Sequence, residues 1–138
     1  MRIINRRSFL TFATALIPTA LLGKAQAATS PNGALLTKSS AIKVGQTLVF
    51  GAKDANGRQI EIALTRTAKG LSAVDGTCTH QGCLVNLKKQ KLICPCHGSV
   101  FDRSTGKVIL GPNGSSKDSI QPLGKYTVVE KAGNIYVR

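Results

Sequence analysis

Apolar and β-branched residues gather in short segments after residue 41, and turn-forming residues separate these segments. The segments expected to form strands are Thr47–Phe50, Gln59–Thr67, Leu71–Val74, Tyr126–Glu130 and Asn134–Val137. Asp54-Ala55-Asn56-Gly57 is a turn signal between the first two, and Lys131-Ala132-Gly133 predicts a closing hairpin between the last two. No segment after residue 28 repeats its apolar positions with a helical period. The pattern therefore predicts an all-β fold, a small antiparallel sandwich or barrel.

The N-terminal segment has a different pattern. Arg6 and Arg7 precede an apolar stretch over residues 9–23, and the small-residue sequence Ala25-Gln26-Ala27 follows. A basic start, an apolar middle and an A-x-A site are typical of a secretory signal peptide. The paired arginines resemble a twin-arginine signal, which indicates export across the cytoplasmic membrane to the periplasmic or extracytoplasmic side. We expect cleavage between Ala27 and Ala28.

A retained membrane anchor is the alternative interpretation of this segment. A spanning helix needs roughly 20 apolar residues, whereas the stretch has 15 at most and contains Pro18. Cleavage is the favoured interpretation, and membrane association stays open. The expected organisation is a twin-arginine-type signal or short anchor over residues 1–27, a linker over residues 28–38 and one domain over residues 39–138.

The chain is strongly basic, with a net charge of +13 and 138 residues. After residue 27 it keeps fifteen basic and six acidic residues. Such an excess can steer association with an acidic partner or an anionic membrane face. Nucleic acid is not expected as a partner, because only Lys88, Lys89 and Lys91 cluster and the 4% of aromatic residues form no base-stacking platform.

Every cysteine and histidine of the chain lies in two short segments, Cys78-Thr79-His80-Gln81-Gly82-Cys83 and Cys94-Pro95-Cys96-His97-Gly98-Ser99. Two thiolates and two imidazoles could form a structural zinc site. Zinc sites, however, rarely begin with Cys-x-His, and four-coordinate zinc would leave two cysteines unused. A Rieske centre holds one iron by two cysteines and the other by two histidines. Both kinds of site remain open on the residue types alone.

The pair C-T-H-x-G-C and C-P-C-H-G-S resembles the two cluster-binding segments of Rieske iron–sulfur proteins of the cytochrome bc type. The resemblance implies one [2Fe–2S] cluster per chain, bound between two loops of a Rieske-type β fold. Cys78 and Cys94 would bind the inner iron. His80 and His97 would bind the outer, more exposed iron.

The resemblance also assigns roles to residues that do not bind iron. Cys83 and Cys96 would form a disulfide between the two loops, a pair that Rieske ferredoxins and ring-oxygenase domains lack. Ser99 would donate a hydrogen bond to a bridging sulfide. Phe101 stands where high-potential members carry a tyrosine that bonds a cysteine sulfur. We therefore expect a potential between those of quinol-oxidising Rieske proteins and Rieske ferredoxins.

The function implied is one-electron transfer, as the iron–sulfur component of a quinol:cytochrome c reductase-like complex or of another membrane-associated respiratory chain. Its partners would be cytochrome b- or c-type proteins, with quinol as a donor. Gln81 departs from the leucine usual in quinol-oxidising members, and Gly111-Pro112 resembles their cluster-covering proline loop. The alternatives are the small subunit of an exported, arsenite-oxidase-like oxidoreductase, with its larger subunit as partner, and a zinc-bound structural module. The chain offers no complete catalytic site of its own.

Overall fold

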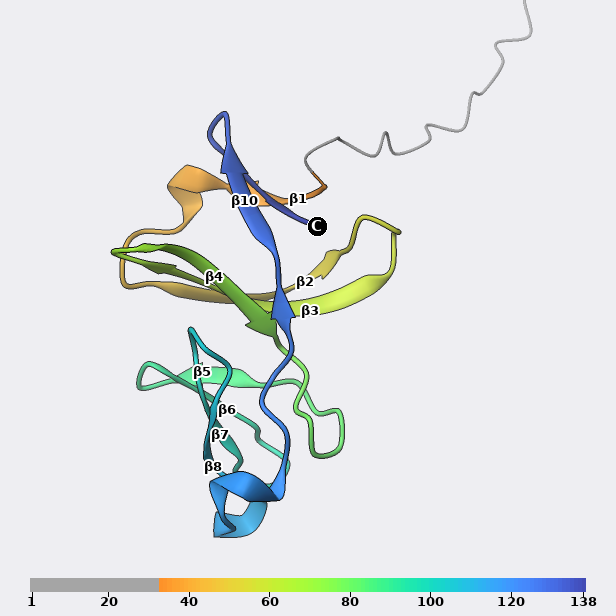
Figure 1. Ribbon diagram of the computed structural model, residues 1–138, viewed down its shortest axis with the longest axis vertical. Coiled ribbons are helices and arrows are strands. Elements are labelled where there is room, and N and C mark those ends of the chain that lie inside the picture. The colour runs from red at the N-terminus through yellow and green to blue at the C-terminus, as the bar shows by residue number, and fades with distance from the viewer. Residues whose placement is uncertain (1–32) are drawn as a thin grey trace, which may run out of the picture.

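The computed structural model describes residues 33–138, and their strands form three antiparallel sheets that follow one another along the longest axis (Figure 1). The sheets have the strand orders β1-β11-β10, β2-β3-β4-β9 and β5-β6-β7-β8. The all-β prediction is confirmed. The predicted signal segment, residues 1–27, lies outside the described residues.

The strands are β1 (Ala34–Lys38), β2 (Thr47–Lys53), β3 (Gln59–Thr67), β4 (Gly70–Asp75), β5 (Asn86–Lys88), β6 (Lys91–Ile93), β7 (Val100–Asp102), β8 (Val108–Leu110), β9 (Lys125–Tyr126), β10 (Val128–Lys131) and β11 (Asn134–Val137). Three short 3-10 turns complete the described elements: η1 (Ser39–Ala41), η2 (Pro112–Gly114) and η3 (Lys117–Ser119). Over residues 33–138 no helix has the length and apolar character needed to cross a membrane.

The middle sheet buries both of its faces, because successive side chains along a strand point to opposite sides. Ile62 and Leu64 of β3 and Ala73 of β4 pack toward the β1-β11-β10 sheet. Ala63 and Val74 alternate with them and belong to the core against the β5-β6-β7-β8 sheet. The middle sheet is therefore the rigid support on which the other two sheets rest.

The chain changes sheets near its C-terminus. Residues 126–130 were expected to form a single strand, but β9 pairs with β4 whereas β10 pairs with β11. Thr127 separates the two strands, and its carbonyl accepts a hydrogen bond from the Arg138 N–H at 2.9 Å. The break occurs because the two halves of this segment serve different sheets.

The linker expected over residues 28–38 is wrong at its C-terminal end, since residues 34–38 form β1. This strand pairs with β11 from Ala34↔Val137 onward, and Leu36 packs against the adjoining core. Apart from its two leucines the segment is rich in small and turn-forming residues, which hid the strand in the sequence. The pairing partner, about a hundred residues away, is what makes it a strand.

A buried hydroxyl network connects the middle sheet to the β7–β8 turn. Thr65 is fully buried, and its hydroxyl donates to the Arg103 carbonyl at 3.0 Å and lies 2.9 Å from the Thr47 hydroxyl. The Arg103 guanidinium donates to the Gly45 carbonyl at 2.7 Å and to the Thr47 hydroxyl at 3.1 Å. These bonds fix the β5-β6-β7-β8 sheet to its support.

The substitution Thr65→Val tests this connection, because valine keeps the volume and removes the hydroxyl. It leaves the Thr47 hydroxyl and the Arg103 carbonyl without this buried partner, and we expect a loss of about 1–3 kcal/mol of unfolding free energy. Urea unfolding followed by circular dichroism measures the change. Thr127→Val, at an exposed position, is the control. A loss no larger than that of the control would contradict the proposed connection.

Candidate metal centre

The loop between β4 and β5 carries the first Cys/His segment. The Cys78 N–H donates to the Cys83 carbonyl at 2.8 Å, and the Gly82 N–H donates to the Cys78 carbonyl at 2.9 Å. Gly82 has a φ of +77°, a conformation that favours glycine. A Cβ at this position would meet no atom within 4 Å, so the backbone conformation, not lack of space, calls for glycine.

The loop between β6 and β7 repeats these hydrogen bonds. The Cys94 N–H donates to the Ser99 carbonyl at 2.9 Å, and the Gly98 N–H donates to the Cys94 carbonyl at 3.0 Å. The φ of Gly98 is +71°. Each loop therefore holds its leading cysteine at the same point of the same backbone turn, and both cysteine side chains are buried, at 2% and 1% exposure.

A third loop, between β7 and β8, has the same pattern without a cysteine. The Asp102 N–H donates to the Lys107 carbonyl and the Gly106 N–H donates to the Asp102 carbonyl, both at 2.9 Å. The leading carboxylate accepts hydrogen bonds from the N–H groups of Ser104 at 3.0 Å and Thr105 at 2.7 Å. Burial raises the pKa of Asp102, but the Thr105 hydroxyl, which donates to the same oxygen at 2.7 Å, and these two N–H groups outweigh it, so the net pKa is lowered. The turn thus directs N–H groups at an anionic leading side chain.

The leading cysteine of the first loop is subject to the same influence. Burial raises the pKa of Cys78, whereas a hydrogen bond from the His80 N–H lowers it. His80 follows Cys78 by two residues, as Ser104 follows Asp102. The nearby Cys94 thiol raises this pKa further, because two thiolates side by side repel one another. The net pKa of Cys78 is raised, and a bound cation would convert this thiol to a thiolate.

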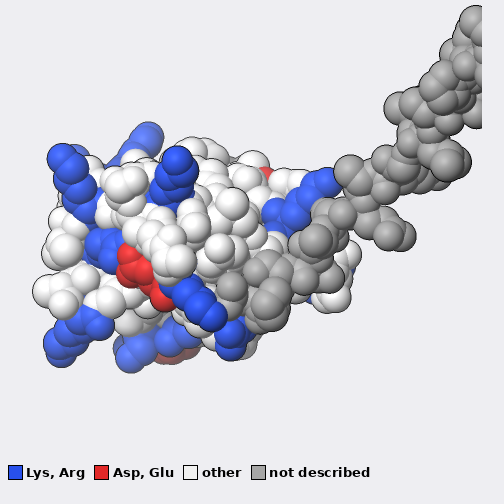
Figure 2. Space-filling model, turned by 90° about the horizontal axis from the view of Figure 1, so that it is seen from above, with Lys and Arg blue, Asp and Glu red and all other residues white. Residues whose placement is uncertain are grey.

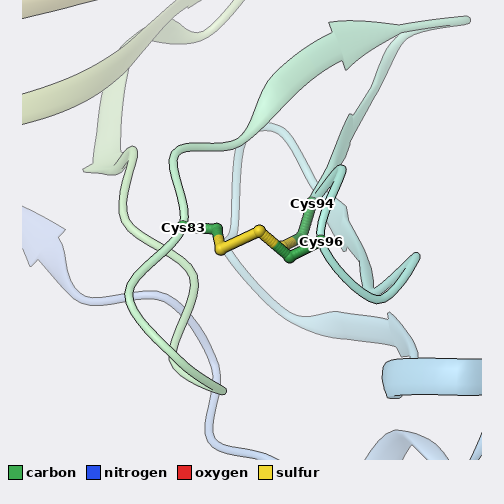
Figure 3. Close-up of side chains that lie close together, drawn as sticks. All are labelled: Cys83, Cys94 and Cys96. Carbon is green, nitrogen blue, oxygen red and sulfur yellow. A yellow bond between two sulfur atoms is a disulfide. The ribbon is translucent and has the colours of Figure 1, made fainter.

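A disulfide between Cys83 and Cys96 connects the two loops, with 6.5 Å between the Cα atoms (Figure 3). The predicted pairing is confirmed. Cys94 lies beside this bond, and its sulfur falls within 4.8 Å of both disulfide sulfurs. A disulfide sulfur carries no thiolate, so of these three residues only Cys94 is free to bind a metal. Cys78 and Cys94 are the remaining free thiols.

The two histidines complete the donor set. The ring centroids of His80 and His97 lie 4.8 Å apart, with the rings 78° from coplanar. Both Nδ1 atoms are buried and have no hydrogen-bond partner among the described residues. Buried polar atoms are rarely left without partners. Two buried, unpartnered nitrogens on rings this close together therefore indicate that something else binds them.

Ser99 presents a further buried polar atom of this kind. Its side chain is fully buried, and its hydroxyl makes no hydrogen bond of good geometry with any described residue. The hydroxyl lies near enough to the Cys78 sulfur to favour the thiolate form, although this contact does not satisfy the oxygen. Two thiols, two imidazole nitrogens and one hydroxyl donor fit a binuclear iron–sulfur centre.

The segment after β8 covers the second loop. The Asn113 N–H donates to the His97 carbonyl at 2.7 Å, and the Thr79 hydroxyl of the first loop donates to the Gln121 carbonyl at 2.6 Å. Asn113 has a φ of +54°, unusual for a residue with a side chain. The resemblance of Gly111-Pro112 to a covering loop thus has a counterpart in direct contacts with both histidine-bearing loops.

Hydroxyl groups hold this covering segment together. The Ser115 and Ser119 hydroxyls lie 2.8 Å apart, and the Ser119 hydroxyl donates to the Ser116 carbonyl at 2.6 Å. They pack directly over Gly111, where a Cβ would overlap both hydroxyl oxygens and the Ser116 carbonyl. Glycine at position 111 is therefore a requirement of space.

The four predicted ligands Cys78, His80, Cys94 and His97 thus lie on two loops joined by a disulfide. The roles of Asn113, Thr79 and the Asp102 turn were not foreseen. The repeated spacing of Cys78 to Gly82, Cys94 to Gly98 and Asp102 to Gly106 was a signal that could have shown the three equivalent turns. The contacts of Asn113 and Thr79 had no local signal.

Comparison with known proteins agrees with this geometry. The family described as "Rieske [2Fe-2S] domain" matches residues 35–129. The cytochrome b6-f complex iron-sulfur subunit of Synechococcus elongatus is 60% identical over 45 residues, which are 31% of this chain and 23% of that protein. The corresponding subunit of Trichodesmium erythraeum is 49% identical over 70 residues, 49% of this chain and 37% of the relative. The matches thus span well under half of these relatives.

Solved structures extend the comparison to the fold. The plasma membrane Rieske protein PetC3 of the cyanobacterium Synechocystis PCC 6803 is 36% identical, with a TM-score of 0.51 over 65% of this chain and 85% of that one. The quaternary ammonium Rieske monooxygenase CntA is 19% identical, with a TM-score of 0.60 over 78% of this chain and 32% of that one. The second likeness concerns the fold alone.

The substitution Gly111→Ala tests the covering segment. Its methyl group would displace the serine hydroxyls and move Asn113 from His97, and we expect a loss of about 1–3 kcal/mol as for other overpacked sites. The thermal midpoint for loss of the visible absorption of bound iron and sulfide measures the effect. Gly124→Ala is the matched control, because its Cβ would approach nothing closer than 3.8 Å. Equal midpoints for both variants would contradict the role of Gly111.

Proposed function

This chain belongs to the Rieske [2Fe–2S] domain family, and from that premise we propose that it is a one-electron carrier, the iron–sulfur component of a quinol-oxidising, cytochrome bc-type complex. Its cofactor is a Rieske [2Fe–2S] cluster. The observation that carries the proposal is the pairing of two equivalent loops, which presents two buried free thiols and two unpartnered imidazole nitrogens while the disulfide occupies the other two cysteines.

We assign the ligands by their surroundings. Cys78 and Cys94 are buried at the base of the two loops and would hold the inner iron as thiolates. His80 and His97 are only partly buried and would hold the outer iron through Nδ1. The same four residues were expected from the sequence. A zinc module would not explain the family match or the buried Ser99 hydroxyl.

The donor set determines how readily an electron enters the site. When bound, the cluster accepts and releases one electron, at potentials of roughly −150 to +300 mV across the family. Two neutral imidazoles in place of two thiolates remove two negative charges from the site. Adding an electron therefore meets less repulsion than at a site with four cysteines.

Ser99 and Phe101 affect the reduction potential of the site further. The Ser99 hydroxyl is buried and available to donate to a sulfide. Phe101 is fully buried in the core beneath the loops and has no donor group. Hydrogen bonds to the sulfurs raise the potential by stabilising the reduced, more negative state. One donor in place of two supports an intermediate potential.

The partner is proposed from the relatives. The cytochrome b6-f subunit of Synechococcus elongatus is 60% identical over 45 residues, and it is a component of a cytochrome complex by name. Leu84, directly after Cys83, is 53% exposed and offers an apolar contact at the loop surface. Gln81 is also exposed, at the position where quinol-oxidising members usually carry leucine. Export by the twin-arginine route and association with a membrane belong to the same proposal.

Metal analysis and spectroscopy test the cofactor and its ligands. The purified chain is expected to contain two irons and two sulfides, and the reduced protein to give the low-average-g paramagnetic resonance spectrum of a Rieske centre. His80→Ala and His97→Ala should each abolish that spectrum, because each removes a ligand of one iron. Gln81→Ala is the matched control and should keep it. A zinc-loaded protein without this spectrum would refute the assignment.

The substitution Phe101→Tyr tests the potential. A phenol donating to a cysteine sulfur would stabilise the reduced site by ~1 kcal/mol, which corresponds to a rise of about 40 mV for one electron. Protein-film voltammetry measures the shift, and Phe50→Tyr on β2 is the control. An unchanged or lower potential in a variant with an intact cluster would contradict the proposal that the missing donor at position 101 lowers the potential.

A further inference from the structure

The hairpin of β5 and β6 presents the densest group of positive charge in the described chain. Lys88, Lys89 and Lys91 are all exposed, and Gln90, between Lys89 and Lys91, is uncharged. All three residues of β5 are exposed along an edge of the sheet. Basic side chains are also scattered over the face seen in Figure 2, but nowhere else in residues 33–138 do three of them fall within four consecutive positions.

The turn of this hairpin has residues that fit its conformation poorly. Lys89 and Gln90 have φ values of +45° and +64°. A two-residue hairpin with both φ values positive strongly favours Asn-Gly, since a side chain is strained in this region. The turn of β10 and β11, by comparison, has glycine in its second position. The β5–β6 hairpin has no glycine to relieve the strain.

The strands of the hairpin add a second local cost. Lys88 and Lys91 are direct partners in the antiparallel register. Like charges directly opposite one another destabilise a strand pair. Two departures from local preference at one exposed turn indicate a role other than stability, because such strain is retained mainly at functional positions.

Apolar side chains lie next to these charges. A groove of about 240 Å³ separates the turn before β2 from the hairpin and is lined by Gly45, Gln46, Thr47, Leu48, Leu87 and Gln90. Leu87 in this lining is 38% exposed; Val44, which precedes Gly45 in the chain, is 65% exposed, and Lys43 is also exposed. A surface that combines lysines with exposed aliphatic groups suits the boundary between headgroups and acyl chains.

The lysines of this surface form no ion pair with any carboxylate among the described residues. Residues 43–48 and 86–91 contain no aspartate or glutamate. Asp102 is the register partner of Lys91, but its Oδ1 accepts hydrogen bonds from Ser104 and Thr105 within its own turn. The lysines are therefore free to meet an external anion.

The hairpin turn and the metal-binding loops lie at opposite ends of the same strands. β5 begins just after Cys83 and runs to the turn, and β6 returns from the turn to Cys94. Binding at the hairpin thus leaves the Cys/His loops accessible to a redox partner. This separation favours an attachment surface over a second electron-transfer contact.

We propose that the hairpin surface, defined as Lys43, Val44, Leu87, Lys88, Lys89 and Lys91, binds the anionic headgroups of a phospholipid bilayer. The lysines contact lipid phosphates, which relieves the repulsion of Lys88 and Lys91, and Val44 and Leu87 enter the interfacial region. This attachment goes beyond the proposed redox role and does not depend on it.

The test measures how much of the full chain, with its cluster, sediments with phospholipid vesicles. One set of vesicles contains phosphatidylcholine alone, and the other also contains phosphatidylglycerol. The hairpin variant Lys88→Gln/Lys89→Asn/Lys91→Gln should bind the anionic vesicles roughly a hundredfold more weakly than the native chain. The control variant Lys107→Gln/Lys117→Gln/Lys125→Gln removes the same charge from exposed positions elsewhere. It should keep most of the binding.

The hairpin variant should also unfold at a higher temperature than the native chain, because it relieves the like-charge pair and puts asparagine at a left-handed position. Misfolding therefore cannot explain its weaker binding. Equal weakening by the control variant, or equal binding of the native chain to both vesicle types, would overturn the proposal. Unchanged vesicle binding by the hairpin variant, even if it formed dimers, would also overturn the proposal. So would binding of the native chain to polyglutamate but not to vesicles.

Discussion

The site depends on one arrangement, the covalent joining of two loops that have the same backbone turn. Each turn is closed by the same two hydrogen bonds and places its leading cysteine inward. Cys83 and Cys96 join the turns, so the loops that carry the two free thiols and the two neighbouring imidazole rings are held together. Because the disulfide uses Cys83 and Cys96, only Cys78 and Cys94 are left as thiols that can bind iron.

The rest of the fold keeps these loops in place. A sheet buried on both faces provides a rigid base, and the Thr65 hydroxyl network fixes the loop-bearing sheet to it. The serine-held segment over Gly111 closes the site from the other side and reaches His97 through Asn113. Support from two directions is what a site needs when small displacements of ligands change the potential of a metal centre.

The densest positive charge along the described chain lies apart from the metal-binding loops. The lysines of the β5–β6 hairpin lie in a strained turn and face one another across the strands, at the end of the sheet away from the histidines. An attachment surface there and an electron-transfer surface at the loops would not compete. The two functions would share the short strands that run between them.

The amino-acid sequence by itself determined the all-β class, the positions of β2, β3, β4, β10 and β11 and the four candidate ligands, because alternation, turn residues and the Cys/His spacing are local properties. The tertiary structure decided what depends on distant partners: β1 becomes a strand through β11, and residues 126–130 divide between two sheets. It also decided that Asn113 and Thr79 secure the loops, and that the turn before β2 lies across a groove from the β5–β6 hairpin. Contacts of this kind arise from packing between segments far apart in the chain, and no local pattern encodes them.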